Sequence, residues 1–293
     1  MTSNSDEIAQ GERFEFGNNW RNFLSVLDDK RIELAVQSLQ KALGRDSLAS
    51  VRMLDAGCGS GLFSLAARRL GATVHSFDYD PQSVACAREL RQRYFPNDPD
   101  WQIEAGSVLD EAYLGGLGQF DIVYSWGVLH HTGSMYRAFG NVLQCVAENG
   151  RLFISIYNDQ GGESRRWRAI KKFYCGLPSM LRLPFAAAVM APKEIISFVG
   201  CLLTLRPGRY WERWHSYGRQ RGMSRWHDHV DWLGGYPFEV ARPEEVIHFF
   251  QNHQLRLTHL KTVGGGLGCN EFIFQSEPAS AAMTSDRRGR VAA

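Results

Sequence analysis

The 293-residue sequence lacks the patterns that mark several large classes of protein. None of its six cysteines forms a C-x-x-C pair, which argues against a zinc ribbon or a disulfide scaffold and fits a reducing cytoplasm. The polar, acidic start does not have the basic-then-apolar order of a signal peptide. A formal net charge of only +2 predicts no polyanionic partner. We therefore expect a cytoplasmic globular protein, with a disordered tail rich in Ala, Ser and Arg over 277–293.

Long uninterrupted apolar runs are also missing. A bilayer-spanning helix needs about 20 predominantly apolar residues, and the stretch from Leu177 to Leu205 is interrupted by prolines and charges. We expect short helices there that form a lid or a homodimer interface. Basic residues flank these helices and tryptophans lie nearby, so peripheral membrane contact is the alternative interpretation. The interruptions are Pro178, Arg182, Pro184, Pro192, Lys193 and Glu194.

One short stretch carries the strongest functional signal. Residues 53–61 read Met-Leu-Asp-Ala-Gly-Cys-Gly-Ser-Gly. The apolar run from Val51 to Leu54 predicts a buried strand that ends in Asp55, and helix-like sequence follows the glycines. A strand, a glycine turn and a helix N-terminus form a nucleotide-type ligand site, because glycine lets a ligand approach main-chain N–H groups. The dinucleotide-binding pattern G-x-G-x-x-G, started at Gly57, would need a glycine at position 62, where this chain has Leu62. The stretch therefore does not match a dinucleotide-binding site.

Strand and helix patterns alternate at short period from residue 51 onward. This alternation predicts right-handed βαβ units and a parallel sheet with helices on both faces. Before the first strand, apolar residues at helical spacing over 20–43 predict two helices that end at Gly44. The expected strands are 51–55, 73–77, 101–105, 120–125, 152–157, 255–263 and 270–275, and the expected later helices are 60–70, 81–94, 134–147 and 243–252. A Gly-rich turn is expected before the fourth strand.

An acidic residue follows the second expected strand at a distance suited to ribose recognition. Asp78 lies 21 residues after Gly57, where a carboxylate can accept hydrogen bonds from ribose hydroxyls. The alternative role for Asp78 is to cap the next helix. Tyr79 could stack on an adenine ring.

The glycine stretch, Asp78 and Phe-Asp-Ile-Val-Tyr-Ser at 120–125 form an ordered series. The series resembles the class I S-adenosylmethionine (SAM) methyltransferases, including small-molecule and ubiquinone-type O-methyltransferases, over about residues 50–158. The resemblance implies a Rossmann-like, doubly wound seven-stranded sheet, mostly parallel with a C-terminal antiparallel hairpin, and SAM as cofactor. The cofactor-binding residues that it implies are Asp55, Gly57, Cys58, Gly59, Gly61, Asp78, Tyr79, Ser107, Val108 and Trp126. Ser107 stands where the family usually has an acidic residue, and a core role for Trp126 is an equal alternative.

A basic, tryptophan-rich insertion separates the fifth strand from the end of the core. Between Asn158 and Phe238 stand thirteen basic and six acidic residues, a formal charge of +7, together with five of the eight tryptophans. We expect a largely helical lid there, which suggests an anionic or amphipathic acceptor. The expected segments are an N-terminal helical cap (1–48), a SAM-binding core (49–158), the insertion (159–238), the C-terminal part of the core sheet (239–276) and the tail (277–293).

Histidines supply the candidate catalytic groups. His131 lies in a Leu-His-His sequence that resembles many small-molecule methyltransferases, and it could act as a base. Its alternative role is a histidine at a helix start that bonds to the backbone. In Trp226 to Trp232, His227, His229 and Asp231 could form a base and its orienting carboxylate, with structural hydrogen bonding as the main alternative. Part of a divalent metal site is a further alternative for this segment, and the predicted site itself includes no metal.

The sequence thus predicts an enzyme that transfers the SAM methyl group to a small-molecule acceptor at a hydroxyl oxygen. After the fourth strand the chain has Ser125-Trp126-Gly127-Val128 instead of an Asn/Asp-Pro-Pro-aromatic run, and it has no Pro-Cys pair, which together disfavour DNA methylation. Two alternatives are an RNA-modifying methyltransferase, whose lid would engage phosphates and bases, and a non-catalytic SAM-binding protein.

Overall fold

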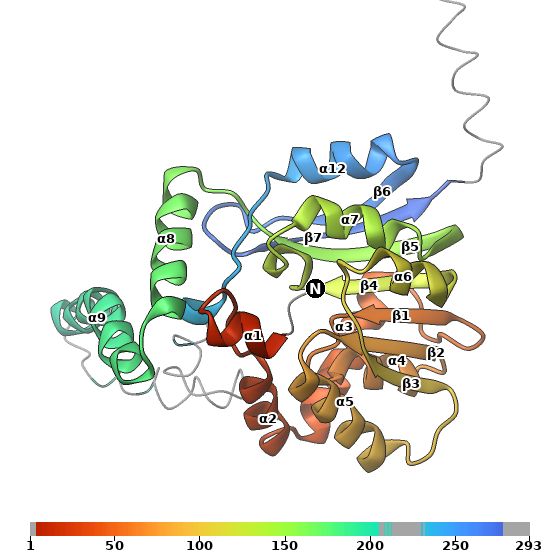
Figure 1. Ribbon diagram of the computed structural model, residues 1–293, viewed down its shortest axis with the longest axis horizontal. Helices are drawn as coiled ribbons and strands as arrows, with labels where there is room; N and C mark the ends of the chain where they lie inside the picture. The colour runs from red at the N-terminus through yellow and green to blue at the C-terminus, as the bar shows by residue number, and fades with distance from the viewer. Residues whose placement is uncertain are drawn as a thin grey trace, which may run out of the picture.

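A seven-stranded sheet forms the centre of the molecule (Figure 1). The computed structural model describes residues 4–204, 208, 210, 212, 230 and 232–277. The strand order is β3-β2-β1-β4-β5-β7-β6. The strands are β1 (Arg52–Ala56), β2 (Thr73–Asp78), β3 (Trp101–Ala105), β4 (Phe120–Trp126), β5 (Val146–Tyr157), β6 (Leu255–Lys261) and β7 (Cys269–Ser276).

The strand directions confirm the expected doubly wound sheet. The first five strands are parallel to one another, whereas β7 runs antiparallel to both β5 and β6. The chain adds β2 and β3 on one side of β1 and then returns to add β4 on the other side. Ligands bind at such a reversal, outside the carboxyl ends of the strands. The ends of β1 and β4 are therefore the expected place for the site.

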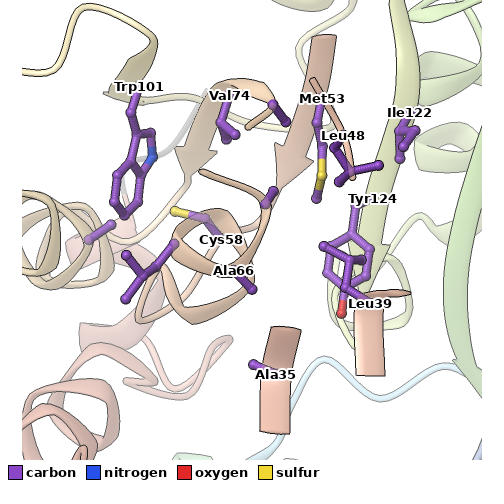
Figure 2. Packing of buried hydrophobic residues seen from close by; sticks show 14 of the residues in the cluster. Ala35, Leu39, Leu48, Met53, Cys58, Ala66, Val74, Trp101, Ile122 and Tyr124 are labelled. Atoms are coloured by element: carbon purple, nitrogen blue, oxygen red, sulfur yellow. The ribbon is translucent and has the colours of Figure 1, made fainter. Parts of the chain in front are cut away.

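Helices cover both faces of the sheet, and two buried clusters result. On one face α3 (Asp29–Leu43), α4 (Leu62–Arg69) and α5 (Pro81–Tyr94) pack on the strands. Figure 2 shows part of this cluster, in which Met53, Val74 and Ile122 of the sheet gather with Leu39 and Ala66 of the helices. The other face carries α6 (Glu111–Leu117), α7 (Met135–Leu143) and α12 (Pro243–Asn252). Side chains alternate between the faces of a strand, so Met53 enters the first cluster and Leu54 the second.

Predictions at two places in the core are wrong: the segment before β4 and the junction of α7 with β5. The Gly-rich segment before β4 forms the helix α6, because the Asp110 side chain accepts the Tyr113 N–H at 3.0 Å and begins the helix. The strand expected from residue 152 begins at Val146, and α7 ends at Leu143. Val146 pairs with Phe120, and the next pair joins Arg151 to Ile122, so an irregularity absorbs the intervening residues. Pairing with β4 overrides the local helical pattern.

The N-terminal segment and the insertion add helices beside the sheet. The two helices expected over 20–43 are α2 (Gly17–Ser25) and α3, and Gly44 ends α3 in the left-handed conformation at φ 62°. A further short helix, α1 (Asn4–Ala9), precedes them. The described part of the insertion contains α8 (Gly162–Gly176) and α9 (Ser179–Leu203). The tail expected after 277 lies outside the described residues.

The helix α9 corrects the prediction of short, interrupted helices. It runs for 25 residues through Pro184 and Pro192. Each proline removes one main-chain hydrogen bond, but both prolines and the residues four positions before them are exposed. The freed carbonyls can be solvated, which explains why the helix continues.

Candidate cofactor and acceptor site

A cavity of about 1000 Å³ lies at the carboxyl ends of β1, β2, β3 and β4. It brings together residues that are far apart in the sequence, and they include most of the predicted site residues. Gly61 is the one described residue of the predicted cofactor set that is not in the cavity wall. The predicted residues that line the cavity are Asp55, Gly57, Cys58, Gly59, Asp78, Tyr79, Ser107, Val108, Trp126 and His131.

The glycine turn after β1 is shaped by close contacts. Gly57 has φ +84°, and a Cβ atom there would lie 2.4 Å from the Val128 side chain. The N–H groups of Gly57 and Cys58 donate to the Phe77 carbonyl at 2.9 and 3.0 Å, which holds the turn against β2. Gly61 also has positive φ, but its missing Cβ makes room for Ala87 of α5 at 2.9 Å. Gly61 therefore serves helix packing, whereas Gly57 shapes the cavity wall.

Asp78 presents a partly buried carboxylate at the end of β2. Its two oxygens accept the N–H groups of Gly59 and Asp80, each at 2.9 Å. Burial raises the pKa of Asp78 to about 6, and these two N–H donors partly oppose the rise. The helix-capping role belongs instead to Asp80, which accepts the Gln82 N–H at 2.8 Å. Because each carboxylate oxygen has a second lone pair, Asp78 can still accept ligand hydroxyls.

Asp55 anchors a buried polar network beneath the turn. Its carboxylate accepts the Ser64 hydroxyl, and Ser64 lies 2.8 Å from the Ser76 hydroxyl. Trp101 Nε1 donates to Ser76 at 2.9 Å. Burial raises the pKa of Asp55 to about 7. The network joins β1, β2, β3 and α4, so it holds the cavity floor in place.

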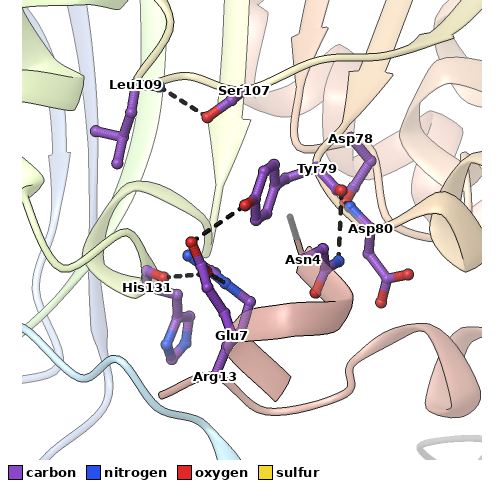
Figure 3. Close-up of polar contacts among 9 residues, drawn as sticks. All are labelled: Asn4, Glu7, Arg13, Asp78, Tyr79, Asp80, Ser107, Leu109 and His131. Carbon is purple, nitrogen blue, oxygen red and sulfur yellow. Dashed lines mark hydrogen bonds and ion pairs between the residues drawn. The ribbon is translucent and has the colours of Figure 1, made fainter. Parts of the chain in front are cut away.

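The N-terminal segment forms part of the cavity wall, a contribution that sequence reasoning missed. Figure 3 shows Arg13 between Glu7 and the His131 carbonyl, which it contacts at 2.6 and 3.0 Å. The Tyr79 hydroxyl donates to Glu7 at 3.1 Å, and the Arg13 guanidinium lies 4.9 Å from the Tyr79 ring centre. In the sequence, only the aromatic residues just before and within α2 could have indicated that this segment lines a cavity. The cavity-lining residues of this segment are Asn4, Arg13, Phe14, Phe16, Trp20 and Phe23.

Aromatic side chains and two histidines line the other end of the cavity. We call this part, formed by His130, His131, Tyr157, Trp167, Met190 and Trp232, the acceptor chamber. Successive ring contacts join Trp167, Trp232 and Tyr157, each with centres 5.7 Å apart. The chamber is an apolar pocket with few polar groups, the usual composition of a small-molecule site.

Both histidines of the chamber are held neutral. Burial lowers the pKa of His131 to about 3, and it lowers the pKa of His130 well below its ordinary value. His131 Nδ1 lies 2.6 Å from the Pro237 carbonyl, which can only accept, so Nδ1 carries the proton and Nε2 is left as an acceptor. His131 thus makes the predicted backbone bond and also lines the cavity. His227, His229 and Asp231 lie outside the described residues.

Lys171 of α8 is buried beside the chamber. Its ammonium group bonds to the Trp232 carbonyl and lies 4.0 and 4.9 Å from the ring centres of Trp232 and Phe238. Burial lowers the pKa of Lys171 to about 7. A buried ammonium group loses its hydration. Lys171 therefore destabilises the folded state at every pH at which it is charged in the unfolded chain.

Replacing Lys171 by methionine should therefore stabilise the protein. We expect the free energy of unfolding to rise by about 1–3 kcal/mol at pH 7. The gain should shrink as pH rises from about 7 toward 10.5, because the unfolded lysine then loses its proton too. Urea unfolding at several pH values measures both effects, with the exposed neighbour Lys172→Met as the control. A destabilisation of equal size at pH 6 and pH 9 would show that the ammonium contacts outweigh its burial.

The sheet order and the glycine-lined cavity define a Rossmann-like nucleotide site of the class I methyltransferase type. A family model described as "Methyltransferase domain" matches residues 27–258. The chain belongs to this class I SAM-dependent methyltransferase family.

Individual relatives match only part of the chain. A ubiquinone biosynthesis O-methyltransferase from Xanthomonas oryzae is 31% identical over 114 residues, which are 39% of this chain and 46% of that protein. A tRNA U34 carboxymethyltransferase from Methylococcus capsulatus is 30% identical over 136 residues, 46% of this chain and 40% of that protein. The chain thus spans less than half of each relative's length. The structure of PKMT2 from Rickettsia typhi, in complex with AdoHcy, matches with a TM-score of 0.53 at 12% identity, covering 83% of this chain and 52% of that one. It shares the fold.

Proposed function

We propose that this protein transfers the methyl group of SAM to a hydroxyl oxygen of a small-molecule acceptor. The observation that carries the proposal is one cavity with two unlike ends. One end has the glycine turn and the Asp78 carboxylate, and the other is the aromatic acceptor chamber. Two features fit an adenosine-type ligand. A side chain at Gly57 would meet Val128, and the buried Asn4 Oδ1 in the wall has no hydrogen-bond partner among the described residues.

The residues of the cavity supply binding, orientation and exclusion of water. When bound, SAM supplies an electrophilic methyl group on its sulfonium. Asp78 would hold the ribose hydroxyls, with Asn4 and Tyr79 beside it. The aromatic rings of the acceptor chamber would hold the acceptor close to the methyl carbon, and such positioning provides much of the rate. Their apolar faces also support an acceptor with an apolar or amphipathic body.

His131 would accept the proton of the acceptor hydroxyl at Nε2. Its depressed pKa makes it a weak base, so proton transfer would accompany formation of the oxygen–carbon bond and not precede it. The Pro237 carbonyl holds the ring in the required tautomer. The predicted alternatives, His227 and His229, remain candidates for the same role.

Calorimetric titration with SAM and with its demethylated product, S-adenosylhomocysteine (SAH), tests the proposal. We expect micromolar binding by the intact protein, and no binding would overturn the proposal. Incubating the protein and methyl-labelled SAM with a metabolite extract, followed by mass spectrometry, then identifies the acceptor. Binding without turnover in any extract would instead support a non-catalytic SAM-binding protein.

Replacing His131 by alanine should lower kcat by about tenfold, the modest effect expected of a weakly basic group. The affinity for SAH should remain largely unchanged, since Asp78 and the glycine turn are untouched. His259→Ala, an exposed histidine on β6, is the control. An unchanged kcat in His131→Ala would remove this histidine from the chemistry and direct attention to His227 and His229.

An RNA acceptor is the second candidate. The similarity to the tRNA U34 carboxymethyltransferase favours it, as do the exposed basic residues Arg165, Arg166 and Arg168 on α8. Co-purification with RNA and a steep salt dependence of binding would support this acceptor class. Labelled product only in the small-molecule fraction would exclude it.

A further inference from the structure

The outer side of α9 is a continuous apolar surface at one end of the molecule. Figure 1 shows α9 beyond α8, far from the sheet. Within the described part of the chain, α9 is the one helix long and apolar enough to cross a membrane, and only 18% of its most apolar 18-residue window is buried. Met180 and Leu203, near its two ends, are each 79% exposed, and Ile196 is 73% exposed. Soluble proteins rarely expose a contiguous apolar surface of this kind without a partner.

Most of the exposed apolar residues of α9 form one stripe along the helix, whereas Leu183, which is 59% exposed, lies outside it. At 3.6 residues per turn, Met180, Ile195, Ile196, Val199, Leu202 and Leu203 fall within an arc of about 160°. Ala186, Met190 and Cys201 lie opposite and are buried. The two described charged side chains of α9, Arg182 and Glu194, lie outside this arc, near its edges. The Arg182 guanidinium bonds to carbonyls at the end of α8, and Glu194 accepts the Tyr210 hydroxyl.

The apolar stripe continues onto α8. Phe173 is 58% exposed, and its ring lies 5.2 Å from that of Phe185 on α9. Exposed basic residues of α8, namely Arg165, Arg166, Arg168 and Lys172, accompany it. Residues 162–203 contain seven basic and two acidic residues, a formal charge of +5 against −3 for the rest of the chain. Apolar surface and positive charge are thus concentrated on the same two helices.

We propose that α8 and α9 dock the protein onto an anionic lipid surface, with α9 lying in the plane of the interface. An apolar helix face beside basic residues is the composition that binds anionic bilayers. A second copy of the chain would instead bring the same exposed basic residues of α8 against the first. The buried side of α9 argues against spanning, because Ala186 and Met190 pack on the protein and Met190 also lines the acceptor chamber. The same helix therefore faces the lipid on one side and the chamber on the other.

Vesicle flotation of the full-length protein tests this docking. We expect co-flotation with vesicles that contain phosphatidylglycerol, weaker co-flotation with phosphatidylcholine alone, and release at high salt. Ile196→Glu and Leu203→Glu should each lower the partition coefficient about tenfold or more, because each removes an apolar side chain from the lipid. Arg165→Gln should lower it about fivefold. Leu34→Glu, a 56% exposed leucine on α3, is the matched control and should float like the wild type.

Several outcomes overturn the proposal. Absence of flotation with both vesicle types does so, and so does equal loss in the Leu34→Glu control. Resistance of the vesicle-bound protein to alkaline carbonate extraction would show a spanning helix. A dimer in sedimentation equilibrium that Ile196→Glu dissociates, without vesicle binding, would assign the stripe to a second copy. Binding of RNA and not of vesicles would assign the basic residues to nucleic acid. Because flotation needs neither SAM nor acceptor, its failure leaves the proposed methyl transfer standing.

Discussion

Replacement of Asp78 by alanine is expected to weaken SAH binding a hundredfold or more, while the protein remains folded. The carboxylate is proposed to accept two ribose hydroxyls, and hydrogen bonds to a charged group contribute about 1.5–3 kcal/mol each. The substitution also releases the Gly59 N–H, which Asp78 accepts at 2.9 Å and which positions the glycine turn. Calorimetric titration with SAH measures the loss. Asp46→Ala, an exposed acidic residue distant from the cavity, is the control.

The same carboxylate should make cofactor binding depend on pH. Burial raises the pKa of Asp78 to about 6, so in the free protein it gains a proton as pH falls through this value. A protonated carboxyl accepts fewer hydrogen bonds, and SAH affinity should therefore fall below about pH 6. Asp78→Asn should bind more weakly at pH 8 and show no such fall. If Asp78→Ala binds SAH with wild-type affinity, or if the SAH affinity of Asp78→Asn depends on pH as in the wild type, Asp78 does not bind the ribose.

Replacement of Gly57 by valine is expected to abolish SAH binding and to destabilise the fold. The position has φ +84°, which a β-branched residue rarely adopts, and its Cβ would lie 2.4 Å from the Val128 side chain. We expect a loss of about 2–4 kcal/mol in the free energy of unfolding, from backbone strain together with overpacking. Thermal unfolding and SAH titration measure the two effects. Gly57→Ala should lie between valine and the wild type.

Two further variants separate contact from backbone strain. In Gly57→Ala, a second substitution of Val128 by alanine should restore part of the stability, because it removes the atoms that the new Cβ meets. Gly116→Ala is the matched control: this glycine lies in α6, and an added Cβ would meet nothing within 4 Å, so alanine should stabilise the helix by about 0.5–1 kcal/mol. Wild-type SAH affinity in Gly57→Val would show that the turn does not shape the cofactor end of the cavity.

The proposed chemistry and the proposed docking meet in the insertion. Trp167 of α8 and Met190 of α9 line the acceptor chamber, and the opposite side of α9 carries the apolar stripe. An acceptor with an apolar body could therefore reach the chamber from the surface to which the protein is docked. The flotation variants and the Asp78 variants act on separate surfaces, so their effects on vesicle binding and on SAH affinity should be independent.

The local sequence pattern was sufficient to predict the centre of the fold. The strand that ends at Asp55, the glycine turn and Asp78 could be predicted because buried parallel strands read as short apolar runs and the turn needs glycine at particular positions. The same local logic predicted α5 and α12 with their observed bounds. It also distinguished this site from a dinucleotide site, through the leucine at position 62.

The tertiary structure decided what depends on contacts between distant residues. Arg13 reaches the His131 carbonyl across 118 positions, and no spacing rule links such residues. Pairing with β4 extends β5 backward to Val146, against the local helical pattern. Burial, which a sequence does not display, turns His131 into a weak base and lowers the pKa of Lys171. The sequence by itself therefore determined the residues of the proposed cofactor end of the site, where the recognising groups are local. Only long-range packing built the acceptor chamber and left the apolar side of α9 exposed.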